Sequence, residues 1–287
     1  MRGRGAKADR RTVRGRSVLV TGAASGIGRA TAQAVARRGG RLVLTDVNDV
    51  GLAATVRDIE AAGGTVELSR ALDVSQYDDV AAFAADVHAQ LGSVDVVMNV
   101  AGISAWGTVE TMPHEQWRQL VEVNLMGPIH VIQHFVPAMI AAGRGGYLVN
   151  VSSSAGLLAF PWHAAYSASK FGLRGVSEVL RFDLARHGIG VSLVVPGAVR
   201  TPLVESVRIA GVDRDDPDVR KLEDRFHKRA AEPADVAESI LRGMERGHFL
   251  VYSSNDIRVG YWMQRKFALP YEVTMQAAND WFTRLLK

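Results

Sequence analysis

The 287-residue sequence predicts an α/β protein. We expect a single doubly wound, Rossmann-type domain, with a central parallel sheet of about seven strands and helices on both faces. Two observations predict this class. Short apolar runs rich in β-branched residues alternate with amphipathic stretches of helical length over most of the chain. The apolar runs are also continuous, as in strands that are buried on both faces.

The expected elements follow one another along the chain. Strands are predicted at 18–20, 42–44, 66–72, 94–98, 148–151, 191–195 and 249–252. Helices are predicted at 29–38, 52–62, 79–91, 116–123, 129–142 and 164–187. Glycine pairs at 39–40, 63–64 and 145–146 suit the left-handed cap with which many helices end before the next strand. Parallel strands joined by helices imply right-handed crossovers.

We interpret residues 15–255 as one domain, because no linker or internal repeat interrupts the alternation. Residues 1–14 form a basic N-terminal extension, and residues 256–287 form an aromatic and basic C-terminal helical extension. Residues 201–232 carry mixed charges, which indicates an exposed insertion at the carboxyl end of the sixth strand.

The composition narrows the class of protein. Apolar residues make up 47% and charged residues 22%, which is ordinary for a globular protein and excludes a disordered one. Cysteine is absent, which excludes disulfides, cysteine-ligated zinc and thiol nucleophiles and is compatible with a reducing compartment. With no secretory signal pattern and no apolar run long enough to span a membrane, we expect a cytoplasmic protein.

The two terminal extensions leave alternatives open. Residues 1–16 hold seven basic residues and one acid, a net charge of +6, so the rest of the chain carries −2 of the total of +4. A solvated extension is a simpler interpretation than contact with nucleic acid or anionic lipid, and we expect no nucleic-acid partner. The C-terminal segment suits a subunit interface or a pocket wall better than a helix lying on a membrane surface.

A glycine-rich turn joins the first strand to the first helix. It runs Thr21-Gly22-Ala23-Ala24-Ser25-Gly26-Ile27-Gly28, with the spacing G-x-x-x-G-x-G. Glycines there let the backbone approach a pyrophosphate, and the N-terminus of the helix presents free N–H groups to the anion. The spacing is not that of a Walker loop, because no Lys-Ser/Thr pair follows. Its position after the first strand predicts dinucleotide binding.

Asp46 ends the second predicted strand. A carboxylate at this place accepts hydrogen bonds from the adenine ribose and repels a 2′-phosphate, where an arginine or lysine would be expected instead. Arg29 and Arg41 are nearby in sequence, but neither stands at the end of the strand. The sequence therefore favours NAD(H) over NADP(H).

Tyr166 and Lys170 are spaced i and i+4, which places them on one face of a helix. A nearby ammonium favours the phenolate and lowers the pKa of a tyrosine, so the pair suits general acid/base catalysis. Ser153, which follows another strand, suits holding a substrate oxygen against the tyrosine. Asn124 is a polar residue in an otherwise apolar helix.

Together these motifs resemble the short-chain dehydrogenase/reductase family over roughly residues 15–255. The resemblance rests on their joint occurrence in the family's order: Thr21-Gly22-x-x-x-Gly26-x-Gly28, Asp73-Val74, Asn99-Val100-Ala101-Gly102, Asn124, Ser153, Tyr166-x-x-x-Lys170 and Pro196-Gly197. Val100 departs from the family, which commonly repeats asparagine there.

The resemblance implies a catalytic tetrad. Tyr166 would exchange a proton with the substrate oxygen, and Lys170 would lower the pKa of Tyr166 and hold the nicotinamide ribose. Ser153 would orient and polarise the substrate, and Asn124 would anchor a water that links the lysine to solvent. The tyrosine helix commonly packs against its copy in this family, so we expect a dimer or tetramer.

The resemblance also implies the remaining cofactor contacts. The glycine loop would bind the pyrophosphate through Gly22, Ser25, Gly26, Ile27 and Gly28, and Asp46 would bind the ribose. The further residues implied are Asp73 and Val74 at the adenine, Asn99, Ala101 and Gly102 at the adenine ribose side, and Pro196, Gly197, Val199 and Thr201 at the nicotinamide end.

Bulky residues follow the motif positions and either ring the substrate pocket or cover the core. They are Trp106, Leu157, Leu158, Trp162, Leu203 and Val204. His163 would be a substrate hydrogen-bonding group or a neutral, partly buried side chain, and the second is favoured. His130 and His134 have zinc-ligand spacing but no third ligand in view, so no metal site is expected.

The predicted function is an NAD(H)-dependent oxidoreductase that interconverts a secondary alcohol and a ketone, with a lipophilic substrate. The alternatives are an NADP(H)-preferring carbonyl reductase of the same family and a non-catalytic nucleotide-binding or scaffold protein. The complete tetrad argues against the non-catalytic alternative.

Overall fold

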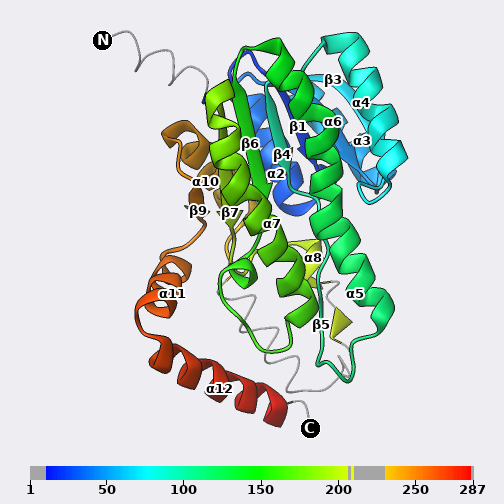
Figure 1. Ribbon diagram of the computed structural model, residues 1–287. Helices are drawn as coiled ribbons and strands as arrows, with labels where there is room; N and C mark the ends of the chain where they lie inside the picture. Colours follow the sequence, from blue (N-terminus) through cyan, green and yellow to red (C-terminus); the bar gives the residue numbers. More distant parts are fainter. Residues whose placement is uncertain (1–10, 206–207, 210–229, 286–287) are drawn as a thin grey trace.

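The computed structural model describes residues 11–205, 208–209 and 230–285. Its core is a seven-stranded parallel sheet in the order β3-β2-β1-β4-β6-β7-β9 (Figure 1). The predicted single Rossmann-type domain is therefore confirmed. Residues 1–10 of the basic extension and most of the insertion at 201–232 lie outside the described residues.

All seven predicted strands are present. The strands of this sheet are β1 (Ser17–Thr21), β2 (Arg41–Asp46), β3 (Thr65–Ala71), β4 (Val96–Asn99), β6 (Gly146–Val151), β7 (Ile189–Val195) and β9 (Leu250–Tyr252). Two short segments, β5 (Ala105–Trp106) and β8 (Arg208–Ile209), pair as a separate two-stranded sheet. The sequence did not predict this pair, because two residues are too short for a periodic pattern.

Helices connect the strands, and short helical turns complete the chain. The helices are α2 (Gly26–Arg37), α3 (Asp49–Ala61), α4 (Tyr77–Leu91), α5 (His114–Val121), α6 (Gly127–Ala142), α7 (Ala164–Asp183), α8 (Pro202–Glu205), α10 (Pro233–Arg246), α11 (Asn255–Lys266) and α12 (Ala268–Leu285). The turns are the 3₁₀ segments η2 (Ser154–Gly156) and η3 (Ala185–His187) and the π-helical segment η1 (Glu122–Met126).

The sheet is covered on both faces, which explains its continuous apolar strands. On β1, Val18 and Val20 pack in the core with α2, α3 and α10, while Leu19 packs in the core with α4 and α6. All three side chains are fully buried. Successive side chains of a strand point to opposite faces, so each strand here contributes to two cores.

One helical run differs from the prediction. Helices were expected at 116–123 and 129–142 with a break between them, but η1 joins α5 to α6 without interruption. By length and apolar composition the run His114–Ala142 would be able to cross a membrane. Here it packs against α4, α7 and β4, with Phe135 and Met139 buried in the core.

The C-terminal segment forms α11 and α12, which extend away from the β9 edge of the sheet (Figure 1). Ile257 and Tyr261 of α11 pack in a core cluster with Leu157 and Leu158. Other large apolar side chains of this C-terminal segment are more than a third exposed: Val259, Trp262, Met263, Phe267, Leu269, Val273 and Trp281.

A buried polar chain fastens α7 to the sheet. Asn99 Nδ2 donates to Asn150 Oδ1 at 2.9 Å, and Asn150 Nδ2 donates to Ser177 Oγ at 2.9 Å. Asn150 and Ser177 are fully buried. Asn150 therefore joins β4, β6 and α7, the helix with the predicted catalytic pair.

We predict that Asn150→Ala lowers the free energy of unfolding by about 2 kcal/mol, because it removes two buried hydrogen bonds and leaves the Asn99 Nδ2 group without its partner. Urea unfolding followed by circular dichroism measures the change. The matched control is Asn279→Ala, an exposed asparagine on α12, which should unfold like the wild type. Equal midpoints for all three proteins would contradict the structural role of Asn150.

Candidate active site

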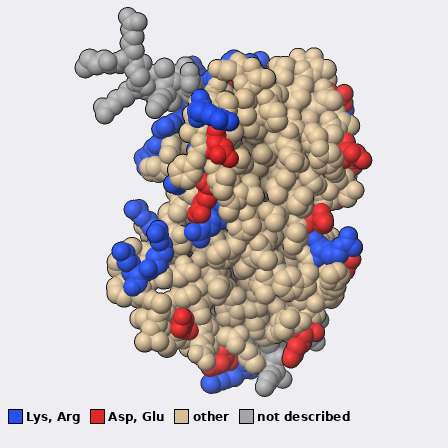
Figure 2. Space-filling model, viewed as in Figure 1, with Lys and Arg blue, Asp and Glu red and all other residues tan. Residues whose placement is uncertain are grey.

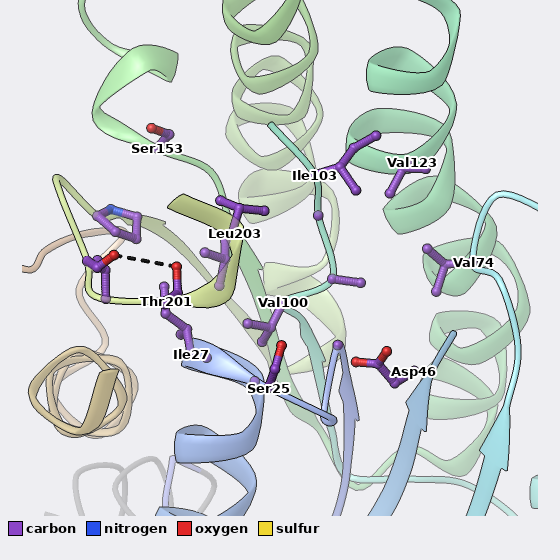
Figure 3. Close-up of a pocket in the computed structure, with 18 of the residues that line it drawn as sticks. Ser25, Ile27, Asp46, Val74, Val100, Ile103, Val123, Ser153, Thr201 and Leu203 are labelled. Atoms are coloured by element: carbon purple, nitrogen blue, oxygen red, sulfur yellow. Dashed lines mark hydrogen bonds between the residues drawn. The ribbon is translucent and has the colours of Figure 1, made fainter. Parts of the chain in front are cut away.

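A cleft of about 390 Å³ opens at the carboxyl ends of β1, β2, β4, β6 and β7. The strand order reverses there, because β1 pairs with β2 on one side and β4 on the other. Such a switch point is where open α/β sheets bind ligands. Figure 3 shows Ser25 and Asp46 near one end of the cleft and Ser153 near the other.

The glycine loop lines the cleft with backbone. Gly22 has φ +71°, a conformation that favours glycine, and a Cβ on Gly22 would lie 2.8 Å from Ala101. A Cβ on Gly28 would lie 1.9 Å from the Gly22 oxygen, so no side chain fits there. The first turn of α2 begins at Gly26 and points its free N–H groups at this space. Its shape and donors fit a pyrophosphate.

The adjoining loop after β4 is held against β1 by a single hydroxyl. Thr21 Oγ1 accepts hydrogen bonds from the backbone N–H groups of Val100 at 3.0 Å and Ala101 at 3.1 Å. Val100, the position that departs from the family, lines the cleft. Because the backbone N–H of Val100 donates to Thr21 Oγ1, the valine leaves the geometry of the loop intact.

Asp46 faces the cleft from the end of β2. Its Oδ2 accepts a hydrogen bond from Ala24 N at 2.9 Å, and its Oδ1 accepts one from Asn48 N at 2.9 Å. These bonds orient the carboxylate, and each oxygen keeps a lone pair for a hydroxyl donor. Among the described residues that line the cleft, Lys170 is the sole cationic one. The Asp46 end therefore fits ribose hydroxyls and offers no positive group to a phosphate.

Asp73 and Val74 form the side of the cleft beyond Asp46. Asp73 Oδ1 accepts from Ser75 N at 2.9 Å, and Val74 O lies 3.0 Å from His130 Nδ1. The rings of His130 and His134 both contact Tyr77, with ring centroids 5.3 Å and 4.6 Å apart. The two histidines therefore pack against the start of α4.

Tyr166 and Lys170 lie side by side on α7 and line the cleft together with Ser153. Tyr166 is 9% exposed and Lys170 is 4% exposed. Lys170 Nζ donates to Val151 O at 3.2 Å and lies 5.8 Å from the centre of the Tyr166 ring. The Ser153 hydroxyl accepts a hydrogen bond from Ala155 N at 3.1 Å and lies close enough to Tyr166 to lower its pKa.

The electrostatics of this pair differ from the sequence-based expectation for the ligand-free protein. Burial raises the pKa of Tyr166, and the Ser153 hydroxyl lowers it by less. Burial also lowers the pKa of Lys170 to about 8. The expected depression of the tyrosine pKa by the ammonium is therefore not the dominant effect here, because desolvation disfavours the phenolate more strongly.

Asn124 lies behind the cleft, fully buried in η1. Its Oδ1 accepts from Ile103 N at 2.8 Å, and its Nδ2 donates to Ile103 O at 2.9 Å and to Ser169 Oγ at 3.2 Å. The π-helical turn directs the carboxamide inward at this place, as such turns often do at functional sites. Asn124 thus joins the loop after β4 to α7.

Most of the predicted cofactor residues line this one cleft. They are Gly22, Ser25, Gly26, Ile27, Gly28, Asp46, Asp73, Val74, Ala101, Gly102, Tyr166, Lys170, Pro196, Gly197, Val199 and Thr201. Asn99 does not line it, because its side chain is turned to Asn150. The periodicity of a strand predicts the face of the sheet on which a side chain lies, but not the residue that it contacts. The sequence therefore did not predict that Asn99 binds Asn150.

The predicted substrate residues divide into two groups. Ser153 and Leu203 line the cleft, whereas Trp106, Trp162 and His163 do not. The rings of His163 and Trp106 are 4.5 Å apart, and His163 Nδ1 lies 2.6 Å from Pro161 O. Burial lowers the pKa of His163, which favours the neutral form. Leu157 and Leu158 are core residues, and the side chain of Val204 is outside the described residues.

Two kinds of residue that contribute to the candidate active site were not predicted from the sequence. The remaining lining residues neighbour the recognised motifs and carry no signal of their own: Val47, Leu72, Val100, Ile103, Gln119, Val123, Val151 and Ser152. Tyr271 of α12 is remote in sequence, yet its hydroxyl accepts from Ala159 N at 2.7 Å. The C-terminal segment therefore supports the loop between Ser153 and Tyr166.

Comparison with known proteins agrees with this geometry. The family model described as short chain dehydrogenase matches residues 16–210. The putative oxidoreductase SadH of Mycobacterium tuberculosis is 37% identical over 237 residues, which cover 81% of this chain and 84% of that protein.

Two solved structures share the fold at high coverage. A short-chain dehydrogenase/reductase from Burkholderia phymatum in complex with NAD has a TM-score of 0.80 and 30% identity, covering 88% of this chain and 94% of that one. A metagenomic short-chain oxidoreductase in complex with NADP has a TM-score of 0.67 and 37% identity, covering 84% and 96%.

We predict that replacing Lys170 by methionine makes the stability difference from wild type pH-dependent. The folded-state pKa of about 8 lies below the ordinary 10.5, so between these values the unfolded chain binds more protons. Raising the pH through this window therefore stabilises wild type relative to Lys170→Met, by up to about 1.4 kcal/mol per pH unit. Urea unfolding of both ligand-free proteins at several pH values measures it; a constant difference contradicts the assigned burial.

Proposed function

The chain belongs to the short-chain dehydrogenase family, and we propose that it is an NAD(H)-dependent oxidoreductase that interconverts a secondary alcohol and its ketone. The observation that carries this proposal is the meeting of Tyr166, Lys170 and Ser153 in the same cleft as the glycine loop and Asp46. The bound dinucleotide would supply or accept the hydride, and the residues of this chain would provide binding, orientation and proton transfer.

Proton transfer falls to Tyr166. Its hydroxyl would give a proton to the ketone oxygen during reduction and take one from the alcohol during oxidation. The Ser153 hydroxyl, which lines the cleft together with Tyr166, would hold the same substrate oxygen. Burial of the tyrosine keeps it protonated in the ligand-free protein, so oxidation requires the phenolate to be favoured by a nearby positive charge.

Lys170 is placed to supply that charge. It is buried beside Tyr166, and its pKa of about 8 lets it exchange a proton near neutral pH. Its ammonium is anchored on Val151 O and faces the cleft, where it would also hold a ribose hydroxyl. Asn124 supports this arrangement from behind by fixing Ile103 and contacting Ser169 on α7.

The preference for NAD(H) rests on the oriented carboxylate of Asp46, which suits ribose hydroxyls and repels a 2′-phosphate. A lipophilic substrate is favoured by the apolar residues near the tyrosine end of the cleft, among them Leu203 and Ile103. We also propose that the protein is cytoplasmic and self-associates. Exposed apolar residues on α7, such as Phe171 and Val179, support the second of these.

We predict that Tyr166→Phe folds and binds cofactor but loses roughly 10²–10⁴-fold in turnover, the usual share of general acid/base catalysis. NADH formation is followed by fluorescence over a panel of steroid, terpenoid, aliphatic and sugar alcohols. Tyr77→Phe, a tyrosine outside the cleft, is the control and should keep full activity. Wild-type turnover in Tyr166→Phe would refute the role of the tyrosine.

We predict that Asp46→Ala weakens NAD(H) binding more than NADP(H) binding, because the variant loses the ribose acceptor together with the charge that repels a 2′-phosphate. Dissociation constants for NADH and NADPH, measured by fluorescence, give the ratio. Asp79→Ala, an exposed aspartate on α4, should leave the ratio unchanged. If both cofactors weaken equally in Asp46→Ala, the cofactor preference is wrong.

A further inference from the structure

A second cavity lies on the flank of the molecule, between α7, β9 and α11, and shares no lining residue with the dinucleotide cleft. Its volume is about 670 Å³. Three arginines and three aromatic residues line most of it: Arg174, Arg181, Arg265, Phe182, Phe249 and Tyr261. We refer to it as the flank groove.

Aromatic rings hold the guanidinium groups of the flank groove in place. The Arg181 guanidinium carbon lies 4.4 Å from the centre of the Phe182 ring and 4.6 Å from that of Phe249. Arg265 contacts the ring of Tyr261 at 5.7 Å. Stacking orders a guanidinium while leaving the N–H groups at its edge free to donate. The two arginines are therefore partly ordered before any ligand arrives.

The charges of the flank groove are unbalanced. Glu178 is its acidic lining residue, and it is bonded to Arg174 at 2.9 Å. Arg174 also donates to the Tyr261 hydroxyl at 2.8 Å. Within the described part of the chain, Arg181 and Arg265 have no carboxylate partner. Figure 2 shows Lys and Arg side chains gathered on the flank where α11 lies in Figure 1.

We propose that the flank groove binds a phosphate group, as an ester or a pyrophosphate. Two stacked arginines without carboxylate partners leave about two positive charges to be matched, and a phosphate ester carries about −1.5 to −2 near neutral pH. Guanidinium edges also match the spacing of phosphate oxygens and bind them in pairs. The aromatic walls, from Phe249 and Tyr261, accept an apolar or planar body attached to the phosphate.

Calorimetric titration with inorganic pyrophosphate at low salt tests the proposal. The protein is first saturated with NADH, because pyrophosphate also suits the glycine loop. Binding of one pyrophosphate per chain is expected, weakened roughly tenfold or more in the double variant Arg181→Gln/Arg265→Gln. The matched control Arg57→Gln/Arg242→Gln removes the same charge from exposed arginines outside the groove and should bind like wild type.

A second arm identifies the source of the phosphate. The same three proteins are sedimented with phosphatidylcholine vesicles that contain or lack phosphatidic acid. Binding only to phosphatidate vesicles, lost in the groove variant, supports a lipid headgroup as the ligand. Pyrophosphate binding without vesicle binding supports a soluble phosphate compound.

Other outcomes overturn the proposal. It fails if wild type binds neither probe, or if the groove variant and the control variant behave alike in both arms. NADH affinity is measured for all three proteins and should be equal, which shows that the fold and the cleft are intact. Failure of wild type to bind NADH would count against the proposed dehydrogenase function and not against the flank groove.

Discussion

The side-chain hydrogen bonds that join α7 to β6 are the contacts on which the candidate active site depends. Asn150 on the strand bonds Ser177 on the helix, and Lys170 Nζ bonds Val151 O at 3.2 Å. A Cβ on Gly156 would lie 2.3 Å from Ser152 Oγ, so the turn after β6 must be glycine to come this close. This approach buries Lys170 and Tyr166 beside the carboxyl end of the strand, where Ser153 completes the group.

That burial has an energetic cost and a chemical use. It disfavours both the ammonium of Lys170 and the phenolate of Tyr166, which is why burial raises the pKa of Tyr166 and lowers the pKa of Lys170. Since burial destabilises the charged form of each group, a ligand that alters the local charge can shift both protonation equilibria. The buried polar chain through Asn150 and the carboxamide of Asn124 compensate by fixing the surrounding backbone.

The C-terminal helices connect this site to the flank of the molecule. Tyr271 bonds the loop that follows Ser153, and Tyr261 packs against that loop while bonding Arg174 on α7. Tyr261 of α11 therefore supports the loop beside the cleft and, together with Arg265, lines the flank groove. The C-terminal extension thus contributes to both regions.

The sequence by itself determined the architecture and most of the cleft. Continuous apolar runs and glycine-punctuated helices predicted the seven strands, and parallel strands must present their carboxyl ends at one edge. Motifs that follow those strands, such as the glycine loop and Asp46, therefore converge without further information. Helical spacing sets Tyr166 and Lys170 on one face, and the motifs that accompany them in the sequence predicted their catalytic role.

Only the tertiary structure decided which long-range partners these residues have. It turned Asn99 toward Asn150, stacked His163 on Trp106 away from the cleft, and drew Asn124 inward through a π-helical turn. It also set the direction of the Tyr166 pKa, which depends on how much water all its neighbours exclude. The periodicity of the sequence predicts which face of a helix or strand each residue occupies. The hydrogen-bond partners of a residue and its exclusion from water depend on segments that only folding brings together.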